Sequence, residues 1–401
     1  MIEPSRRAEP SSPVIESSSR RPIPQSLYAL AMLDIHWFLP TGGDSRDVLP
    51  SGANPHRRPP DIGYLTQVAV ACDELGFGAV LTPCGTGCED AWLITAALLP
   101  VTKRLKFLVA FRPTLLSPTL AAQMASTYQR ISGGRLKINI VTGAEQAELA
   151  RFGIWEDKET RYERTGEFMK VMKNAWNESP YNFTGNHYRV EGATTREIPD
   201  PIPEIYFGGA SEAAETVAAE QVDVYLAWGE PPAMVGERVE RMLRLAAAAD
   251  RTLRFGIRFH VIARPTSEAA WAEADRLVAG MDADSVAAAQ ADFAKTQSVG
   301  QRRQAELAQN AQGTRMEIYP NIWAGIGMVR GGVGTAIVGS YDEVADRIAE
   351  YHALGFDEFI LSGYPHLEEA YWFGEGVMPV LRNRGLLSAL TRGVAPVFSF
   401  R

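Results

Sequence analysis

Hydrophobic positions gather in short apolar runs that alternate with longer amphipathic segments. Eight runs are bounded like β-strands, at 28–38, 78–81, 106–110, 136–140, 204–207, 222–226, 255–263 and 358–361. Segments with helical spacing separate them, at 63–75, 90–98, 118–131, 161–176, 211–220, 232–249 and 342–354. Strands that alternate with helices pair in parallel, and eight such units close into a (β/α)8 TIM barrel of the α/β class. An open doubly wound sheet is the alternative, although no G-x-G-x-x-G sequence follows the first run to favour it.

The chain has 401 residues, more than a minimal barrel of ~250, so it must carry insertions. We expect a barrel over 26–380 with insertions at 143–160, 180–203 and 264–338. The sequence of the second insertion predicts a small hairpin. The sequence of the third insertion predicts a helical stretch over 266–312 followed by a glycine-rich loop. An arm over 1–25, rich in Ser, Pro and Arg, is expected to be disordered, with a strap on a partner subunit as the alternative. The apolar tail over 381–401 is expected to pack on a partner subunit.

The seventh predicted strand carries two side chains that a buried strand does not usually contain. Arg258 and His260 alternate with Ile257, Phe259 and Val261, so the two sets point to opposite faces. A buried cation costs several kcal/mol unless something pairs with it. We therefore expect Arg258 and His260 to face a ligand, and the alternative is an internal salt bridge beside a satisfied core histidine.

Glycine and polar residues collect after the predicted strands, where the active site of such a barrel lies. The turn 208–211 opens a helix whose N-terminal amides would favour a phosphate, although left-handed backbone geometry explains the glycines equally well. The loop 325–334 has five glycines and Arg330 in ten residues. Such a loop costs entropy to order, which favours a lid that closes on a ligand over a plain flexible linker.

Composition excludes several other classes of protein. The net charge is −8 without a long basic run, which argues against a nucleic-acid surface. No apolar run is long enough to cross a bilayer. The three cysteines imply no disulfide framework and favour a reducing cytoplasm. Cys84 and Cys88 have no matching ligand pair downstream, so we expect no metal site.

Several motifs recur in order at the predicted strand ends. They are Trp37–Thr41, Cys88–Trp92, Leu108–Pro113, Asn139–Gly143, Trp228–Pro232, Arg258-x-His260 and Ser362–Glu369. Together they resemble the FMNH2-dependent alkanesulfonate monooxygenases of the bacterial luciferase-like superfamily, from about residue 34 to about residue 379. The family's fold is a (β/α)8 barrel with insertions, which agrees with the independent strand count.

The resemblance implies cleavage of a C–S bond by reduced FMN and O2, which gives sulfite and an aldehyde. A separate NAD(P)H-dependent FMN reductase supplies the FMNH2, and a homodimer or homotetramer is expected. The implied catalytic residues are Arg258, His260, Arg330, Tyr364 and Cys88. The implied FMN-binding residues are Asn139, Thr142, Tyr162, Gly209, Ala210 and Ser211, and Trp228, His36 and His366 would contact the substrate.

Two arginines suit a sulfonate, which is a fixed anion, and His260 and Tyr364 are candidate proton carriers. The reactivity of Cys88 stays open, because the helix start and the adjacent acids act on a thiol in opposite directions.

Five positions depart from the family's pattern. Gly42 stands where a histidine is usual, Thr86-Gly87 where Arg-Ser is usual, and Ala227 where a threonine is usual. His36 replaces an apolar residue. Less bulk and an added polar group predict a larger, more hydroxylated sulfonate, and sulfoquinovose fits this description.

Two other functions compete with desulfonation. A deazaflavin-dependent or flavin-dependent hydride-transfer oxidoreductase shares the superfamily's architecture, and oxygen consumption with sulfite release separates the two. A non-catalytic flavin-binding protein is the third reading, against which the presence of Arg258, His260, Arg330 and Tyr364 argues.

Overall fold

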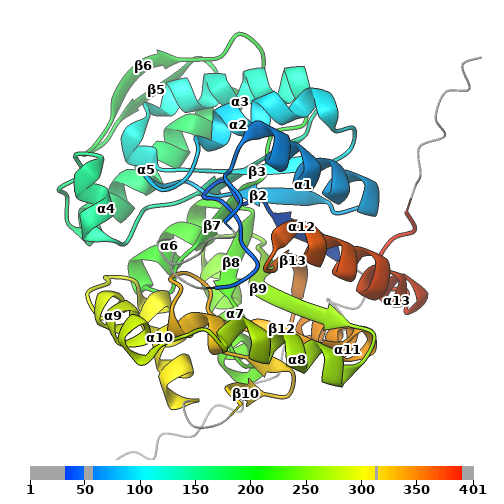
Figure 1. Cartoon of the computed structure of the whole chain (residues 1–401). Helices are drawn as coiled ribbons and strands as arrows, with labels where there is room; N and C mark the ends of the chain where they lie inside the picture. Colours follow the sequence, from blue (N-terminus) through cyan, green and yellow to red (C-terminus); the bar gives the residue numbers. More distant parts are fainter. Residues whose placement is uncertain (1–31, 49–56, 312–314, 391–401) are drawn as a thin grey trace, which may run out of the picture.

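A closed barrel of eight parallel strands forms the centre of the molecule (Figure 1). This computed structural model describes residues 32–48, 57–311 and 315–390, so the predictions for 1–25 and 391–401 lie outside it. The barrel strands, in order around the barrel, are β1 (Asp34–Phe38), β2 (Ala79–Thr82), β3 (Lys106–Phe111), β4 (Leu136–Ile140), β7 (Ile205–Gly208), β8 (Val224–Trp228), β9 (Arg254–Arg264) and β13 (Phe356–Ser362). Pairing of β8 with β9 and of β13 with β1 closes the ring, which confirms the predicted (β/α)8 fold.

Helices cover the outside of this barrel, and most begin where the sequence predicts. They are α1 (Ile62–Leu75), α2 (Ala91–Leu98), α3 (Pro118–Ser132), α5 (Lys158–Asn177), α6 (Glu212–Gln221), α7 (Pro232–Ala248), α11 (Tyr341–Ala353), α12 (His366–Tyr371) and α13 (Met378–Asn383). The side chains of Asp61, Asp90 and Ser117 each accept an amide hydrogen from the first turn. Such caps satisfy donors that have no partner within the helix.

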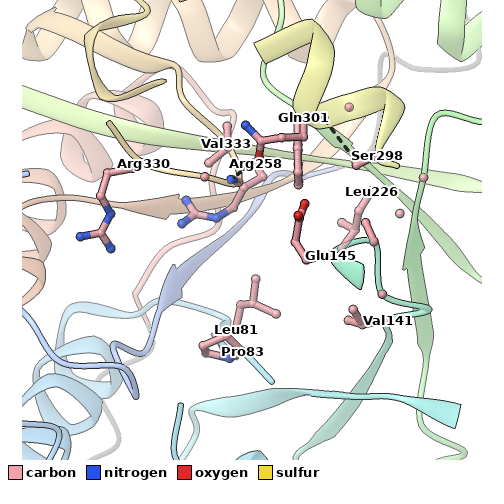
Figure 2. Close-up of a pocket in the computed structure, with 18 of the residues that line it drawn as sticks. Leu81, Pro83, Val141, Glu145, Leu226, Arg258, Ser298, Gln301, Arg330 and Val333 are labelled. Carbon is pink, nitrogen blue, oxygen red and sulfur yellow. Dashed lines mark hydrogen bonds between the residues drawn. The ribbon is translucent and has the colours of Figure 1, made fainter. Parts of the chain in front are cut away.

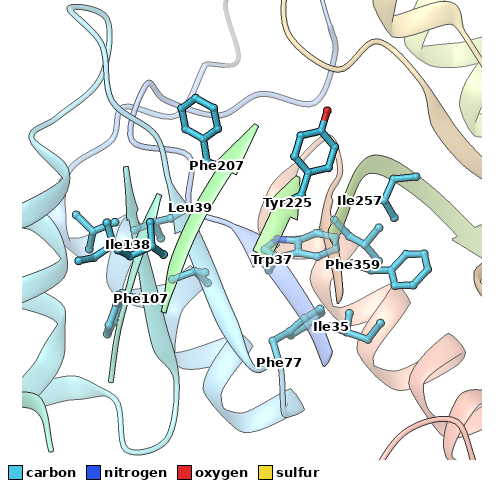
Figure 3. Packing of buried hydrophobic residues seen from close by; sticks show 14 of the residues in the cluster. Ile35, Trp37, Leu39, Phe77, Phe107, Ile138, Phe207, Tyr225, Ile257 and Phe359 are labelled. Atoms are coloured by element: carbon cyan, nitrogen blue, oxygen red, sulfur yellow. The ribbon is translucent and has the colours of Figure 1, made fainter. Parts of the chain in front are cut away.

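Strand alternation divides the apolar residues into two sets. Ile35 and Trp37 of β1 point outward and pack against the helices, together with Phe77 (Figure 3). The indole Nε1 of Trp37 also donates to the backbone carbonyl of His366 at 3.0 Å. The outer core therefore positions the start of α12.

The inward residues form layers along the barrel axis. Leu81, Leu108, Tyr206, Val224 and Ile360 form a buried middle layer. Below it, towards the start of the strands, lies the carboxylate of Glu358, which is 1% exposed. The barrel is therefore filled at this end, and a cavity can open only at the other.

Four side chains compensate the buried charge of Glu358. It lies 2.9 Å from His36 Nε2, accepts from Tyr206 Oη at 2.6 Å, accepts from Arg254 Nη1 at 2.6 Å, and lies 3.8 Å from Lys137 Nζ. Burial by itself would raise the pKa of Glu358. Hydrogen bonding and the charges of His36, Lys137 and Arg254 outweigh burial and lower the pKa to about 2.

The insertions contain more structure than the sequence predicts. The first holds α4 (Gln146–Arg151), and the second forms the predicted hairpin from β5 (Tyr181–Thr184) and β6 (Arg189–Ala193). The expected helical stretch is three separate helices, α8 (Ser267–Val278), α9 (Ala283–Phe293) and α10 (Val299–Asn310). They are followed by β10 (Glu317–Tyr319), β11 (Ile322–Trp323), the short helix η4 (Gly325–Met328) and β12 (Ala336–Ser340).

Strand β12 was missed because its run of small residues follows the glycine-rich loop. It pairs in parallel with the second half of β9, from Ala336 beside His260 to Ser340 beside Arg264. This pairing extends β9 beyond the barrel rim and fixes the insertion to it.

The described part of the C-terminal tail packs on its own barrel. Leu386 and Leu387 lie against the outer core, and the Leu386 carbonyl accepts from the amide of Leu33 at 2.9 Å. These two leucines are therefore partly buried against their own barrel. Among the described residues, no helix is long and apolar enough to span a bilayer.

We predict that Glu358→Gln lowers the free energy of unfolding at pH 7 by roughly 3–5 kcal/mol, because the buried side chains of His36 and Lys137 lose their buried carboxylate partner. Lys137 and Arg254 then keep the partly exposed Glu204 as a close counter-charge. A carboxyl whose pKa falls on folding stabilises the fold above its unfolded pKa, and this contribution disappears as the pH falls towards about 2. The variant should therefore lose part of the pH dependence of stability below about pH 4.5. Urea unfolding at a series of pH values measures both effects.

The control is Glu191→Gln, which removes a carboxylate that lies 2.7 Å from Arg189 but is 75% exposed. Exposed pairs contribute about 0–1 kcal/mol, so this variant should unfold like the wild type. Equal effects of the two substitutions would contradict the role given to Glu358.

Candidate active site

A cavity of about 1010 Å³ opens at the carboxyl ends of the barrel strands. The structure brings thirteen of the fourteen predicted site residues to its wall: Cys88, Asn139, Thr142, Tyr162, Gly209, Ala210, Ser211, Trp228, Arg258, His260, Arg330, Tyr364 and His366. Side chains from α9, α10 and the loop before β12 complete it. The volume is at the upper end for ligand pockets, which allows more than one small molecule to bind.

The remaining residue, His36, is not part of the cavity wall, so its predicted position is corrected. It points into the barrel but pairs with Ile360 in the middle layer, and its Nε2 lies 2.9 Å from Glu358. The next inward residue of β1, Phe38, lines the cavity instead. Nitrogen and oxygen atoms of His36, Asp34 and Glu358 lie within 4.8 Å of one another, as metal ligands could. That candidate cation site is empty, and Lys137 Nζ lies 3.7 Å from Asp34.

Arg258 and Arg330 are cations without a carboxylate partner among the described residues. Arg258 is buried, stacks 4.8 Å from the ring of Phe38, and donates from Nη1 to the carbonyl of Phe259 at 2.6 Å. Burial lowers its pKa to about 10, so the group is still charged at neutral pH. Arg330 stacks 5.1 Å from the ring of Tyr364. Figure 2 shows both guanidinium groups at the same side of the pocket.

His260 lines the cavity, but both of its ring nitrogens contact the protein. Nε2 lies 3.2 Å from the carbonyl of Val333, which can only accept, so Nε2 carries the hydrogen. Nδ1 then accepts from Ser362 Oγ at 2.7 Å. Burial and the nearby charges of Arg258 and Arg330 lower the pKa of His260 well below its usual value. His260 is therefore a neutral side chain of fixed orientation, stacked 5.3 Å from the ring of Tyr364.

His366 has a different environment. Its Nδ1 lies 2.8 Å from Asp44 Oδ1, and its backbone amide donates to Asp44 Oδ2 at 2.8 Å. The hydroxyl of Tyr64 donates to the same carboxylate. Burial would raise the pKa of Asp44, but the contacts with His366 and Tyr64 outweigh burial and lower it.

The glycine-rich loop before β12, predicted as a lid, is packed on the preceding helices. Glutamine amides from the preceding helices bind its backbone. Gln290 donates to the carbonyls of Gly327 and Met328 at 2.9 Å, and the amides of Gly332 and Gly334 donate to Gln301 and Gln304 at 2.7 and 2.8 Å. These contacts offset the entropy cost of ordering glycines and hold Arg330 over the cavity.

The two cysteines near the cavity are not activated as nucleophiles. Burial raises the pKa of Cys88, and it raises the pKa of Cys84 to about 11. Both thiols are therefore protonated near neutral pH, and neither is an activated nucleophile.

The far end of the cavity contains buried polar atoms that suit an anion. Ser211 occupies the N-cap position of α6, yet its side chain caps no amide, and its Oγ is buried without a hydrogen-bond partner. The buried Oγ1 of Thr142 also has no partner. A Cβ at Gly209 would come 2.5 Å from Ala214 Cβ, so the chain can turn this closely only with glycine. Lys158 and Arg161 also line the cavity.

Sequence reasoning missed three residues that orient the site. Ser362 and Asp44 each contact a cavity histidine, and Gln301 holds the loop while its buried Nε2 has no partner. Asp44 and Ser362 stand at predicted strand ends, which is the signal available in the sequence. Gln301 lies in a helical stretch of the third insertion, where nothing indicates that it reaches the barrel.

Comparison with known structures agrees with this architecture. A riboflavin lyase crystallised with modified FMN and riboflavin superposes with a TM-score of 0.73 at 19% identity, over 89% of this chain and 93% of that one. An EDTA monooxygenase from Chelativorans sp. BNC1 gives 0.71 at 19% identity, over 89% and 95%. An F420-dependent secondary alcohol dehydrogenase gives 0.64 at 17% identity, over 87% and 99%. At these identities the likeness shows the fold alone.

The sequence comparison is more specific. Residues 33–358 match the family described as luciferase-like monooxygenase, which covers the chain from before β1 to the start of β13, insertions included. The chain therefore belongs to the luciferase-like monooxygenase family.

Proposed function

We propose that this protein is a two-component flavin monooxygenase that cleaves the C–S bond of an organosulfonate. In the balanced reaction, R-CH2-SO3⁻, reduced FMN and O2 give R-CHO, sulfite, FMN, water and one proton. The carbon next to sulfur is oxidised to an aldehyde, and O2 is the oxidant. Reduced FMN would come from a separate NAD(P)H-dependent reductase.

The observation that carries this proposal is the pair Arg258 and Arg330. Elsewhere in the described chain, the buried Arg238 and the partly buried Arg264 have a carboxylate within 2.8 and 2.6 Å. The buried Arg161 at the far end of the cavity instead donates to the carbonyl of Glu156 and the side-chain oxygen of Gln297. A cavity with two uncompensated guanidinium groups instead favours an anionic ligand, and the planar donors of arginine match the oxygens of a sulfonate.

The far end of the cavity fits FMN. The buried hydroxyls of Ser211 and Thr142 and the start of α6 would hold the phosphate, with Asn139 and Tyr162 beside them. The reduced flavin supplies the electrons with which O2 is activated. The protein binds and orients both ligands, and the anchored loop covers the cavity.

Small residues in the cavity wall support a bulky sulfonate such as sulfoquinovose over a simple alkanesulfonate, whereas His36, the added polar group of the sequence, does not reach the wall. Gly42, Gly87 and Ala227 are small residues of the wall, where larger ones would fill space. A Cβ at Gly42 would lie 3.1 Å from the backbone carbonyl of Gly87, so the two loops approach closely here only because residue 42 is glycine.

We predict sulfite release when the protein is mixed with an FMN reductase, NAD(P)H, FMN, O2 and a sulfonate. Sulfoquinovose and octanesulfonate are the two test substrates, and an anaerobic reaction is the control. Faster turnover of octanesulfonate would refute the sugar assignment. Substrate-dependent flavin or deazaflavin reduction without sulfite would favour the hydride-transfer alternative.

Arg258→Ala and Arg330→Ala should each lower kcat/KM for the sulfonate at least about 100-fold. The reason is the loss of charge-assisted hydrogen bonds that contribute ~1.5–3 kcal/mol each. Arg189→Ala is the matched control, because this arginine is 74% exposed on the hairpin. Full activity of both cavity variants would contradict a sulfonate site here.

Ser211→Ala should weaken binding of FMN roughly 10-fold or more, the scale of one hydrogen bond to a charged group. Binding of riboflavin, which lacks the phosphate, should not change. Flavin fluorescence quenching measures both. Ser117→Ala is the control, because this serine caps α3 and its variant should affect stability only. Equal loss for FMN and riboflavin would place the phosphate elsewhere.

A further inference from the structure

We infer that His366, positioned by Asp44, is the proton-accepting group of this site, and that His260 is not. The inference rests on the proposed function, whose balanced reaction removes one proton from the carbon next to sulfur. A base must therefore face the cavity with a free lone pair.

The contacts of His366 define which nitrogen is free. An ionised Asp44 can only accept, so the hydrogen of a neutral imidazole ring lies on Nδ1, which is 2.8 Å from Asp44 Oδ1. Nε2 then carries the lone pair, and no partner binds it among the described residues. The ring lies in the cavity wall, 5.6 Å from Phe38 and 5.4 Å from Tyr364.

The contacts of Asp44 fix the orientation of the His366 ring. Its Oδ2 accepts from the backbone amide of His366 and from Tyr64, so both carboxylate oxygens are engaged. The indole of Trp37 fixes the carbonyl of His366 from the opposite side. Both the backbone and the ring of His366 are therefore held before any ligand binds, as a preorganised base requires.

His260 cannot accept a proton in the same way. Its Nε2 already donates to Val333, and its Nδ1 already accepts from Ser362. A proton could enter only by breaking the contact with Ser362, beside two arginines that disfavour a third positive charge.

Charges around His366 allow it to become positive in turn. The titratable and charged groups around His366 and Asp44 come from six elements. They are Asp44 itself on the loop after β1, Tyr64 on α1, Arg258 and His260 on β9, Arg330 before β12, Tyr364 after β13, and Glu368 on α12. Glu368 forms ion pairs with Arg46 and Arg58. The carboxylate of Asp44 stabilises the imidazolium directly, against the two cavity arginines.

The proton step balances simply. The C–H bond next to sulfur breaks, its proton goes to Nε2, and the carbon becomes the aldehyde carbon while O2 is reduced. The imidazolium then gives the proton to water, and His366 returns to its starting form.

The first test is ¹⁵N NMR of protein labelled at its six histidines, which does not depend on turnover. His366→Asn assigns the signal. We expect a protonated Nδ1 and an unprotonated Nε2 in the wild type, and Asp44→Asn should change this pattern. The opposite tautomer, or a spectrum that Asp44→Asn leaves unaltered, overturns the inference even if sulfite is released.

The second test is the pH profile of kcat for sulfite release. In the wild type, kcat should rise with pH, because a general base accepts a proton only in its unprotonated form. Asp44→Asn should lower kcat about 100-fold, within the range for general acid–base catalysis. His366→Asn should abolish the rise, whereas His260→Asn should retain it.

His352→Asn is the matched control, because this histidine lies on α11 and its Nδ1 contacts only the Phe356 carbonyl, at 3.1 Å. Its profile should equal that of the wild type. Loss of the rise in His260→Asn rather than in His366→Asn would reverse the assignment. Absence of sulfite from the wild type would instead refute the proposed function and the catalytic role together, while the NMR result would still decide how Asp44 positions His366.

Discussion

The cluster around Glu358 is the interaction on which the rest of the barrel depends. Strands from distant parts of the sequence meet at this carboxylate: β1 through His36, β4 through Lys137, β7 through Tyr206 and β9 through Arg254. The group is buried, so each partner must be in place for the charge to be tolerated. The cluster fixes which strands surround the axis and fills one end of it.

Buried charges at the active-site end of the barrel are arranged differently from those around Glu358. Near Glu358 every buried charge has a partner, whereas at the carboxyl ends Arg258 and Arg330 have none in the described chain. A protein that leaves two cations uncompensated loses stability there, and a bound anion restores the balance. His260 lies beside these cations as a neutral side chain, and the Asp44–His366 pair lies near them at the same end of the barrel.

Sequence reasoning recovered the parts of the molecule that depend on local pattern. Alternation along β9 was sufficient to place Arg258 and His260 on the inner face, and glycine or cap residues located most helix boundaries. Sequence reasoning failed where a residue's position depends on its depth along the barrel axis or on contacts with residues distant in the sequence. His36 has the parity of an inward residue, but no pattern reveals that it lies one layer too deep for the cavity. The order of the glycine-rich loop depends on glutamines more than twenty residues away in the sequence.

The way this loop is anchored has a consequence for the shape of the cavity. Gln290, Gln301 and Gln304 contact only its main-chain amides and carbonyls, so its position does not require particular side chains from the loop itself. Residues such as Val329 and Val333, which face the cavity, can therefore be exchanged while the path of the chain is retained. The path of the loop is therefore compatible with different cavity-facing side chains, and so with cavities of different shape.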